Sequence, residues 1–597
     1  MLDFSLPALY QVPSGGNLSD LVHQNAERHP DVAVLSRKVD GSWTDLTAAQ
    51  FLAEVHSAAK GLIAAGIEPG DRVGVMSRTR YEWTLLDFAI WSAGAVTVPV
   101  YETSSAEQVQ WILGDSGAVA VLTETDGHAA LVEQVRGALP ELKHTWQIER
   151  GALAALAEAG TGVADTTVTE RRSVPGADSI ATIVYTSGTT GRPKGCQLTH
   201  GNFMAELGNV TARLEPLFRT GESSVLLFLP LAHVLGRIAE IAAAITPIKL
   251  GHVSDIKDVT AELASFRPTL ILGVPRVFEK VFNTARSKAQ ADGKGRIFDR
   301  AADTAVAYSR ALDRGRVGLM LRLRHTVFDR LVYSRLRAAL GGRATHAISG
   351  GAPLGERLGH FYRGIGFTVL EGYGLTETCA ATAFNPHDKP KIGTVGQPLP
   401  GSAVRIAEDG EVMLKGPQVF TGYWNNPQAT AEALRDGWFA TGDLGALDDE
   451  GYLSITGRKK EIIVTAGGKN VAPAVIEDRI RAHALVGEVM VVGDRKPFIA
   501  CLVTVDEDFF PKWKEMNGKP AGATVAELRE DADLLAALQS AVDEGNAAVS
   551  HAEAVKKFRL LDTVFSEASG HLTPSLKLKR NVVLRDYAVE VEALYLR

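Results

Sequence analysis

The residues best suited to binding a polyphosphate form one stretch, 186–195, with the sequence Thr-Ser-Gly-Thr-Thr-Gly-Arg-Pro-Lys-Gly. Its glycines let the backbone approach a ligand closely, while its hydroxyls and the cations Arg192 and Lys194 supply hydrogen-bond donors and positive charge. The Gly-Lys-Ser/Thr ending of a P-loop is absent, because Pro193 precedes Lys194 and Gly195 follows it. A P-loop kinase is therefore not predicted, and a flexible surface turn is the alternative for such a loop taken alone.

A second motif, residues 371–378, could bind the rest of a nucleotide. It places Tyr373 between Gly372 and Gly374, so that an aromatic face is available for stacking on adenine. The hydroxyl of Thr376 could reach a phosphate, and the carboxylate of Glu377 could hold Mg²⁺, which prefers oxygen ligands. Taken alone, this motif could equally be a turn closed by an aromatic side chain.

Three further segments contain residues suited to the same ligand. Gly350 and Gly351 end a strand-like segment and leave room for a bound molecule. Asp443 lies in a tight turn, where its carboxylate could accept hydrogen bonds from both hydroxyls of a ribose. Near the C-terminus stand Lys577 and Lys579, two cations that could balance negative charge on a ligand.

In this order and combination, the motifs resemble the acyl-adenylate-forming superfamily and, within it, the long-chain fatty-acyl-CoA synthetases of bacterial type. The resemblance extends from residue 186 to residue 580. It implies that Mg·ATP and a fatty acid give acyl-AMP and pyrophosphate, and that CoA then displaces AMP to form a thioester. Such a reaction uses ATP, Mg²⁺ and CoA and needs no side-chain nucleophile, because the mixed anhydride is already activated.

The resemblance also implies roles for individual residues. ATP and AMP would be bound by Thr186, Ser187, Gly188, Thr189, Thr190, Gly191, Lys194, Gly350, Gly372, Tyr373, Gly374, Thr376, Asp443 and Arg458. The catalytic residues would be Lys577, Thr376 and Glu377, with Glu377 as the Mg²⁺ ligand. Lys579 remains an alternative to Lys577, because Leu576 replaces the glycine that usually precedes the family's catalytic lysine.

Other implied roles concern the acyl group, the hinge and CoA. His233 and Gly351 would line the acyl pocket, Lys460 would be the hinge, and Gly467, Gly468 and Lys469 would face CoA. Simple packing is the alternative for His233. The apolar segment 238–248 suits a hydrocarbon chain, and a plain core helix is the alternative there.

Several other functions share these motifs in part. A ligase that loads an acyl carrier protein and a medium-chain acyl-CoA synthetase are the main alternatives. A luciferase-like oxygenase is less favoured, as is an amino-acid adenylation domain, because residues 229–236 contain no acidic anchor for an α-amine. A nucleotide-binding regulator without catalysis is disfavoured by the intact Glu377, Asp443, Arg458 and Lys577.

The elements that position these motifs alternate between helical and strand-like patterns. Helices are predicted at 48–65 and 83–93, and strands at 72–76, 95–100, 118–122 and 180–185, with Thr199 and Asn202 as caps of a following helix. Such alternation indicates an α/β fold with parallel-rich sheets flanked by helices. With 597 residues, at least two domains are expected, and we place them at 1–459 and at 460–597, the latter a small mobile lobe.

Composition and charge limit the partners. The net charge of −7 gives no general reason to expect nucleic acid, whereas residues 280–343 carry fifteen Lys and Arg against five Asp. Basic amphipathic helices there could rest on an anionic membrane, and a solvated helical face is the alternative. Three well-separated cysteines and the lack of a signal segment or a membrane span predict a cytoplasmic protein, peripheral at most, and a homodimer is a further prediction.

Overall fold

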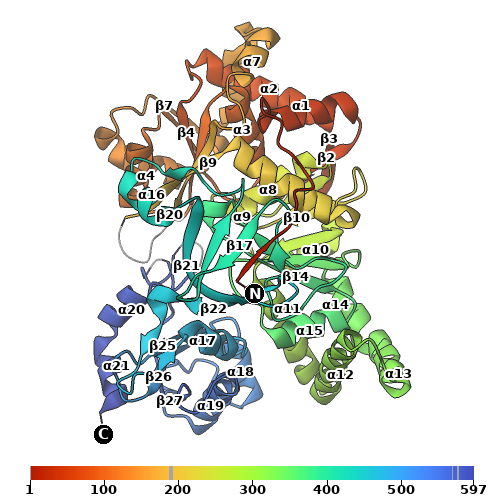
Figure 1. The fold of residues 1–597 in the computed structure, drawn as a ribbon, viewed down its shortest axis with the longest axis vertical. Coiled ribbons are helices and arrows are strands. Elements are labelled where there is room, and N and C mark those ends of the chain that lie inside the picture. Colours follow the sequence, from red (N-terminus) through yellow and green to blue (C-terminus); the bar gives the residue numbers. More distant parts are fainter. Residues whose placement is uncertain (1, 187–191, 568, 574–576, 597) are drawn as a thin grey trace.

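The computed structural model describes residues 2–186, 192–567, 569–573 and 577–596, and its strands form three large and two small sheets within these ranges. The three large sheets and their helices make up the N-terminal region, and a smaller lobe with helices on its sheet follows (Figure 1). The predicted α/β class is therefore confirmed. All three cysteines are free and buried.

The first large sheet holds both ends of the 186–195 stretch. Its order is β19 (Gly422–Tyr423), β9 (Lys194–Thr199), β8 (Ile180–Thr186), β5 (Val96–Val100), β4 (Arg72–Met76), β6 (Ala120–Thr123) and β7 (His144–Gln147). The five strands from β8 to β7 are parallel, while β8 and β9 form an antiparallel pair. The strand predicted at 72–76 has these bounds, and the other predicted strands shift by one or two residues.

The second large sheet ends in the Tyr373 motif. Its order is β16 (Gln397–Pro398), β15 (Ala383–Phe384), β14 (Thr368–Tyr373), β13 (His346–Ser349), β12 (Leu270–Gly273), β10 (Ser224–Leu227), β11 (Lys249–His252), β2 (Ala33–Val39) and β3 (Ser42–Thr47). The strands from β14 to β2 are parallel. Since β13 ends at Ser349 and β14 at Tyr373, the glycines of both motifs lie at the same edge of this sheet.

Three almost fully buried helices connect the two sheets: α3 (Tyr81–Ser92), α8 (His200–Arg213) and α9 (Val234–Ile245). Helix α9 contacts the second sheet, while α3 and α8 contact the first and α8 also packs on α9. The fully buried Arg237 joins α9 to α3 and to the first sheet, because its guanidinium pairs with Asp87 of α3 and donates to Oγ1 of Thr182 on β8 over 2.8 Å. This contact fixes α9, and with it the preceding His233.

An antiparallel sheet carries the Asp443 turn. Its strands are β1 (Asp3–Ser5), β17 (Ala403–Ile406), β18 (Glu411–Lys415), β20 (Leu434–Arg435), β21 (Trp438–Leu447) and β22 (Leu453–Arg458). In the pairing of β21 with β22, Asp443 lies opposite Arg458. The two charged side chains are thereby brought together by strand register.

The C-terminal lobe has its own core. Strands β25 (Val486–Val492), β26 (Ile499–Val505) and β27 (Val555–Leu560) pack against α17 (Pro473–Arg481) and α19 (Ala532–Asn546). Helices α20 (Arg580–Asp586) and α21 (Ala588–Tyr595) cover the other face. The apolar core of the large region includes residues up to Leu453, and that of the lobe begins at Ile463.

The basic region 280–343 is helical, as predicted, but its helices differ in their surroundings. It contains most of α11 (Pro275–Ala291), then α12 (Gly295–Asp313), α13 (Leu319–Phe328) and α14 (Ser334–Ala339). Helix α12 packs on α15 (Glu356–Gly364), whereas α13 projects beyond it at the lower right of Figure 1. In the described ranges, we find no helix whose length and apolar content would suffice to cross a bilayer.

Candidate active site

The two sides of the phosphate-binding stretch are held in register by strand pairing. Thr186, the last residue of β8, lies opposite Lys194, the first residue of β9. The guanidinium of Arg192 stacks 4.8 Å from the ring centroid of Trp111, whose Nε1 donates to the carbonyl oxygen of Pro193 over 2.9 Å. The predicted contacts Ser187, Gly188, Thr189, Thr190 and Gly191 lie outside the described residues.

Glu377 lies beside the far end of this stretch. It belongs to a short 3₁₀ turn, Thr376–Thr378, that follows β14. The hydroxyl of Tyr423 donates to Oε1 of Glu377 over 2.7 Å, and Nζ of Lys194 lies 5.1 Å from the centroid of the same tyrosine ring. Tyr423 therefore brings a carboxylate and a cation of two separate motifs to one place.

Asp443 is the centre of a second cluster. The hydroxyl of Tyr373 donates to Oδ2 of Asp443 over 2.7 Å, and Nε of Arg458 donates to Oδ1 over 2.8 Å. Burial and the neighbouring carboxylate of Asp443 raise the pKa of Tyr373 well above its ordinary value, so its hydroxyl stays protonated. Asp443 is buried as well, and it offers two acceptor oxygens beside an aromatic ring.

Lys577 faces both clusters from the C-terminal lobe. Its backbone N–H donates to Oγ1 of Thr573 over 3.0 Å, and its side chain remains exposed to solvent between the walls of the site. The surrounding protein and the positive charge of Arg458 lower the pKa of Lys577, while Asp443 and Glu377 act in the opposite direction. Its ammonium group therefore senses the charges of both motifs.

Lys579, the alternative to Lys577, has different surroundings. Its positive charge acts on Glu567. Burial raises the pKa of Glu567, and Oε1 of this residue accepts a hydrogen bond from the hydroxyl of Thr103 over 2.7 Å. It also precedes α20 directly and donates its backbone N–H to the carbonyl oxygen of His571. The structure thus brings Lys577, not Lys579, towards Asp443 and Glu377.

His233, Gly350 and Gly351 border the same space. His233 is the N-cap of α9, where its Nδ1 accepts from the backbone N–H of Leu235 over 3.1 Å. Burial, with a smaller repulsion from Lys577, lowers its pKa to about 3, so the ring is neutral. A Cβ on Gly350 would lie 3.7 Å from both the Gly372 carbonyl oxygen and the Leu235 side chain, in ordinary van der Waals contact, so Gly350 lies next to both β14 and α9.

Contacts between the two regions fix the lobe in this orientation. Arg276 of α11 pairs with Glu488 of β25 over 2.9 Å, and Lys280 pairs with Asp508 over 3.0 Å. Lys460, the predicted hinge, is exposed in a short turn between β22 and the lobe. The orientation that presents Lys577 to the site is therefore stabilised mainly by charged groups.

The glycine loop with Gly467, Gly468 and Lys469 is not brought to this cluster by any described contact. It joins β23 (Ile463–Val464) to β24 (Asn470–Val471), and its residues are exposed. Nζ of Lys469 lies 3.3 Å from Oε1 of Glu553, and the backbone contacts of the loop are also with the lobe. A role in binding CoA would require another orientation of the lobe.

Comparison with known proteins identifies the family. A family profile described as AMP-binding enzyme matches residues 22–424, and one described as AMP-binding enzyme C-terminal domain matches residues 460–597. The chain belongs to the AMP-binding enzyme family. Long-chain-fatty-acid–CoA ligase FadD15 of Mycobacterium bovis is 53% identical to this AMP-binding enzyme over 100% of both chains. Its Mycobacterium tuberculosis counterpart has the same identity, 53%, over 100% of both chains.

A solved structure shares the fold of this AMP-binding enzyme. O-succinylbenzoate coenzyme A synthetase from Bacillus subtilis, in complex with AMP, has a TM-score of 0.67 and 22% identity. The match covers 96% of this chain and 98% of the other. The match extends over the large region and the lobe, and therefore shows that the whole chain has the fold of an adenylate-forming enzyme.

Tyr423 is the functional residue that sequence reasoning missed. Its segment, Phe420 to Trp424, is a short aromatic cluster around a glycine, which suggests packing rather than chemistry. The pairing of β19 with β9 brings Tyr423 beside Lys194, and the backbone N–H of Phe420 donates to the carbonyl oxygen of Glu377 over 2.8 Å. An aromatic hydroxyl within such a cluster is the one signal that could have suggested it, since a buried Tyr hydroxyl usually needs a partner.

Asp443→Ala should raise the KM for ATP of this AMP-binding enzyme by about 10- to 100-fold, because a charged hydrogen-bond acceptor is lost. Tyr373→Phe removes one donor to the same carboxylate and should cost less than about tenfold. Steady-state kinetics at varied ATP tests both. Asp409→Ala is the matched control, since Asp409 forms an exposed ion pair with Lys459 and should have almost no effect. An unchanged KM in Asp443→Ala would exclude the residue from the nucleotide site.

Glu279 of α11 should make lobe closure depend on pH. Burial raises the pKa of Glu279 to about 7 from an ordinary 4.5, with Asp478 and Glu488 adding repulsion that Arg481 and Arg276 oppose. In the described orientation of the lobe, called closed here, Glu279 therefore keeps its proton to a higher pH than it would in an open orientation that exposed it to solvent. Closure is favoured at low pH, and its advantage is lost as the pH rises from 4.5 through about 7.

The measurement is ATP–pyrophosphate exchange as a function of pH, taken as the ratio of wild type to Glu279→Gln. We expect this ratio to fall several-fold, up to about tenfold, as the pH rises from 4.5 to about 7, and to stay constant above that pH. Glu507→Gln is the control, since this acid lies beside the Lys280–Asp508 pair without a described partner. A ratio that does not change with pH would contradict the assignment.

Proposed function

We propose that this enzyme is a long-chain fatty-acid–CoA ligase that forms acyl-AMP and then acyl-CoA. The observation that carries the proposal is the identity of 53% over the full length to enzymes of that name. Support also comes from the site, where a mobile-lobe lysine, Lys577, faces the clusters around Asp443 and Glu377. These are the charges that adenylation of a carboxylate requires.

In the first step, a carboxylate oxygen of the fatty acid attacks the α-phosphorus of ATP, and pyrophosphate leaves. We propose that residues 186–191 and Lys194 bind the phosphates and that Asp443 and Arg458 bind the ribose. Adenine would lie against Tyr373, between Gly372 and Gly374. Thr376 and Lys577 would donate to the oxygens on which negative charge develops, so that catalysis rests on positioning and electrostatics.

Glu377 suits the magnesium ion that accompanies ATP. Its carboxylate is a hard oxygen donor, oriented through Oε1 by the hydroxyl of Tyr423. Groups of three or more His, Cys, Asp or Glu with metal-binding geometry are absent from the described ranges, so the remaining ligands would be phosphates and water, as Mg²⁺ prefers. Bound there, the ion would neutralise phosphate charge.

In the second step, the CoA thiolate attacks the acyl carbonyl and AMP leaves. We propose that residues 460–597 turn about Lys460, which withdraws Lys577 and brings Gly467, Gly468 and Lys469 to the site. Support comes from the separate apolar cores of the two regions and from the exposed position of Lys460. The acyl chain would extend from Gly351 and His233 along α9, with its many alanine and isoleucine residues.

The proposal includes a location. Three free, buried cysteines suit a reducing compartment, and we place the enzyme in the cytoplasm, in peripheral contact with a membrane. Long-chain acids dissolve in bilayers, so such contact would bring the enzyme to its substrate.

Release of pyrophosphate from ATP and palmitate, with and without CoA, tests the proposed function. Equal amounts of pyrophosphate and palmitoyl-CoA, the latter followed by mass spectrometry, are expected when CoA is present. Accumulation of acyl-AMP with no thioester would instead indicate a ligase that loads a carrier protein. A series of acids from octanoate to stearate, compared by kcat/KM, then separates a long-chain from a medium-chain preference.

A further inference from the structure

Helix α13 and the turn after it, Asp329–Tyr333, form an arm that is unlike the rest of the basic region. Helix α11 is engaged with the C-terminal lobe through Arg276 and Lys280, and α12 packs on α15. In α13, by contrast, no residue is buried. The charge and the apolar side chains of this arm are therefore free to contact something outside the chain.

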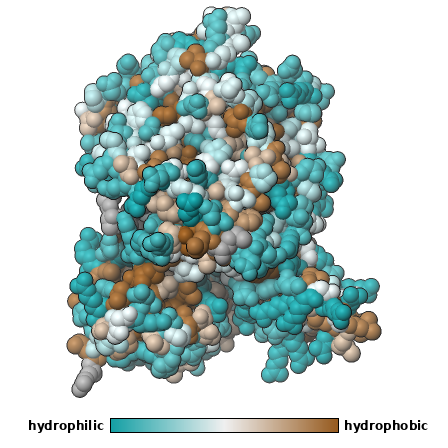
Figure 2. Space-filling view, viewed as in Figure 1, coloured by the Kyte–Doolittle hydropathy of each residue, from teal (hydrophilic) through white to brown (hydrophobic). Residues whose placement is uncertain are grey.

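The exposed side of the arm is apolar. Its large exposed side chains are Leu319, Met320, Leu323, Val327 and Leu331. At about 100° per residue, they cover an arc of roughly 120° on one side of the helix. Leu319 is 84% and Leu323 is 61% exposed, which is far above the exposure of a core-facing leucine. Figure 2 shows hydrophobic surface on this projection, at the lower right, next to hydrophilic surface.

The opposite side of the arm fixes its orientation. Nε2 of His325 donates to the carbonyl oxygen of Gly364 over 2.6 Å, and its ring stacks on Tyr308 with centroids 3.9 Å apart. Tyr333 is fully buried, and its hydroxyl donates to the carbonyl oxygen of Ala301 over 2.7 Å. Because these contacts hold the inner side, the apolar stripe is presented outwards.

Arginines flank the stripe. The arm and its preceding loop contain Arg314, Arg316, Arg322, Arg324 and Arg330. Of these five, none lies within 4.0 Å of a carboxylate among the residues that the structure describes. The nearby acids are neutralised elsewhere, since Asp329 pairs with Arg337 over 2.7 Å and Asp313 with Arg363 over 2.6 Å. By helical spacing, Arg322 and Arg324 border the stripe on its two sides.

We propose that α13 docks the enzyme on the surface of an anionic lipid bilayer. The stripe of Leu319, Leu323 and Val327 enters the boundary between headgroups and acyl chains, and the flanking arginines bind lipid phosphates. A stripe one helix wide on a convex arm is too narrow for the roughly 800 Å² per partner of a stable protein interface. The inference rests on the proposed function in one respect, namely that a fatty acid substrate would be held in that bilayer.

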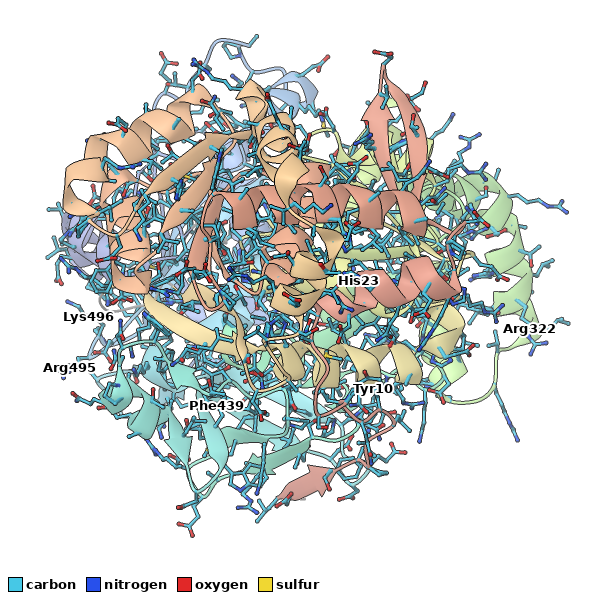
Figure 3. All side chains as sticks on the ribbon, turned by 90° about the horizontal axis from the view of Figure 1, so that it is seen from above. Tyr10, His23, Arg322, Phe439, Arg495 and Lys496 are labelled. Carbon is cyan, nitrogen blue, oxygen red and sulfur yellow. The ribbon has the colours of Figure 1, made fainter. Side chains whose placement is uncertain are left out.

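The arm is well placed for docking without obstructing the lobe. Figure 3 shows Arg322 at the outer rim of the molecule, on the side opposite Arg495 and Lys496 of the C-terminal lobe. The lobe contacts the large region through α11, not through α13. The outward stripe of α13 is therefore separate from the ion pairs that join the lobe to the large region.

Co-sedimentation of the full chain with vesicles tests this inference without any substrate. Wild type should bind vesicles of phosphatidylcholine mixed with phosphatidylglycerol and bind pure phosphatidylcholine far less. The double variant Arg322→Gln/Arg324→Gln should lower the partition coefficient on anionic vesicles by roughly thirtyfold, since each cation near such a surface contributes a factor of about five. Leu323→Ser/Val327→Ser should lower it by a similar factor. Arg495→Gln and Val589→Ser, which change exposed residues of the lobe, are the matched controls and should bind like wild type.

Equal binding of wild type and both double variants would overturn the inference, and so would a failure of wild type to bind anionic vesicles. If wild type fails to bind but is a dimer in sedimentation equilibrium that Leu323→Ser/Val327→Ser dissociates, the arm is an interface between copies instead. Pyrophosphate release from palmitate without vesicles should be unchanged in Arg322→Gln/Arg324→Gln. That assay reports on the proposed function alone, so failure of one proposal is distinguishable from failure of the other.

Discussion

Lys577→Ala should lower the rate of acyl-adenylate formation by about two to three orders of magnitude. The reason is that its ammonium group is the cation that the lobe presents to the site, between the Asp443 and Glu377 clusters. The rate is measured as ATP–pyrophosphate exchange with palmitate. Thioester formation from supplied palmitoyl-AMP should remain near the wild-type rate, because in the proposed mechanism the second step uses another orientation of the lobe.

Lys579→Ala is the control for this prediction. The two lysines are two residues apart and equal in charge, but Lys579 acts on Glu567 at the edge of the lobe contact. We expect less than a fivefold change in exchange for Lys579→Ala, because no described ion pair of its ammonium group would be lost. Exchange at the wild-type rate in Lys577→Ala, with a large loss in Lys579→Ala, would transfer the catalytic role to Lys579.

Glu377→Ala should lower kcat/KM for ATP by about two orders of magnitude and raise the Mg²⁺ concentration needed for half-maximal rate. It removes the carboxylate that accepts a hydrogen bond from Tyr423, whose ring lies beside Lys194 of the phosphate-binding stretch. Glu377→Gln keeps the shape and the acceptor for Tyr423 but not the charge, so it should behave like Glu377→Ala in its Mg²⁺ dependence.

Tyr423→Phe separates the position of Glu377 from its charge. This change removes the 2.7 Å hydrogen bond and leaves the carboxylate in place. The expected loss is about five- to tenfold in kcat/KM, the usual effect of one hydrogen bond. An unchanged Mg²⁺ dependence in Glu377→Ala would show that Glu377 is not a Mg²⁺ ligand, whatever the effect of the substitution on the rate.

The sequence was sufficient to predict many of the local helices and strands and to locate the motifs. The strand at 72–76 was predicted with its observed bounds because it is a short β-branched run between turns, and Thr199 was predicted as a cap of α8 from its hydroxyl. The glycine motifs could be recognised because some of their backbone positions have no room for a side chain. A Cβ on Gly374, for example, would lie 1.7 Å from the carbonyl oxygen of Ala380.

What the sequence could not give were the contacts between distant segments. Glu377 and Tyr423 meet because β19 pairs with β9 and because the backbone N–H of Phe420 donates to the carbonyl oxygen of Glu377. Burial where α11 meets the lobe raises the pKa of Glu279. The basic region 280–343 was predicted as basic amphipathic helices, without any distinction among them. The structure distinguishes them, because α11 and α12 bury residues in internal contacts whereas α13 buries none.

The central claim, that an acyl-adenylate is formed at this site, is tested most directly with palmitate labelled by ¹⁸O in its carboxylate. Attack of the carboxylate on the α-phosphorus followed by thiolysis at the acyl carbon must leave one labelled oxygen in AMP. Mass spectrometry of the products with ATP and CoA should therefore find ¹⁸O in the phosphate of AMP and none in pyrophosphate. Label in inorganic phosphate together with ADP, or unlabelled AMP with a full yield of palmitoyl-CoA, would contradict the account.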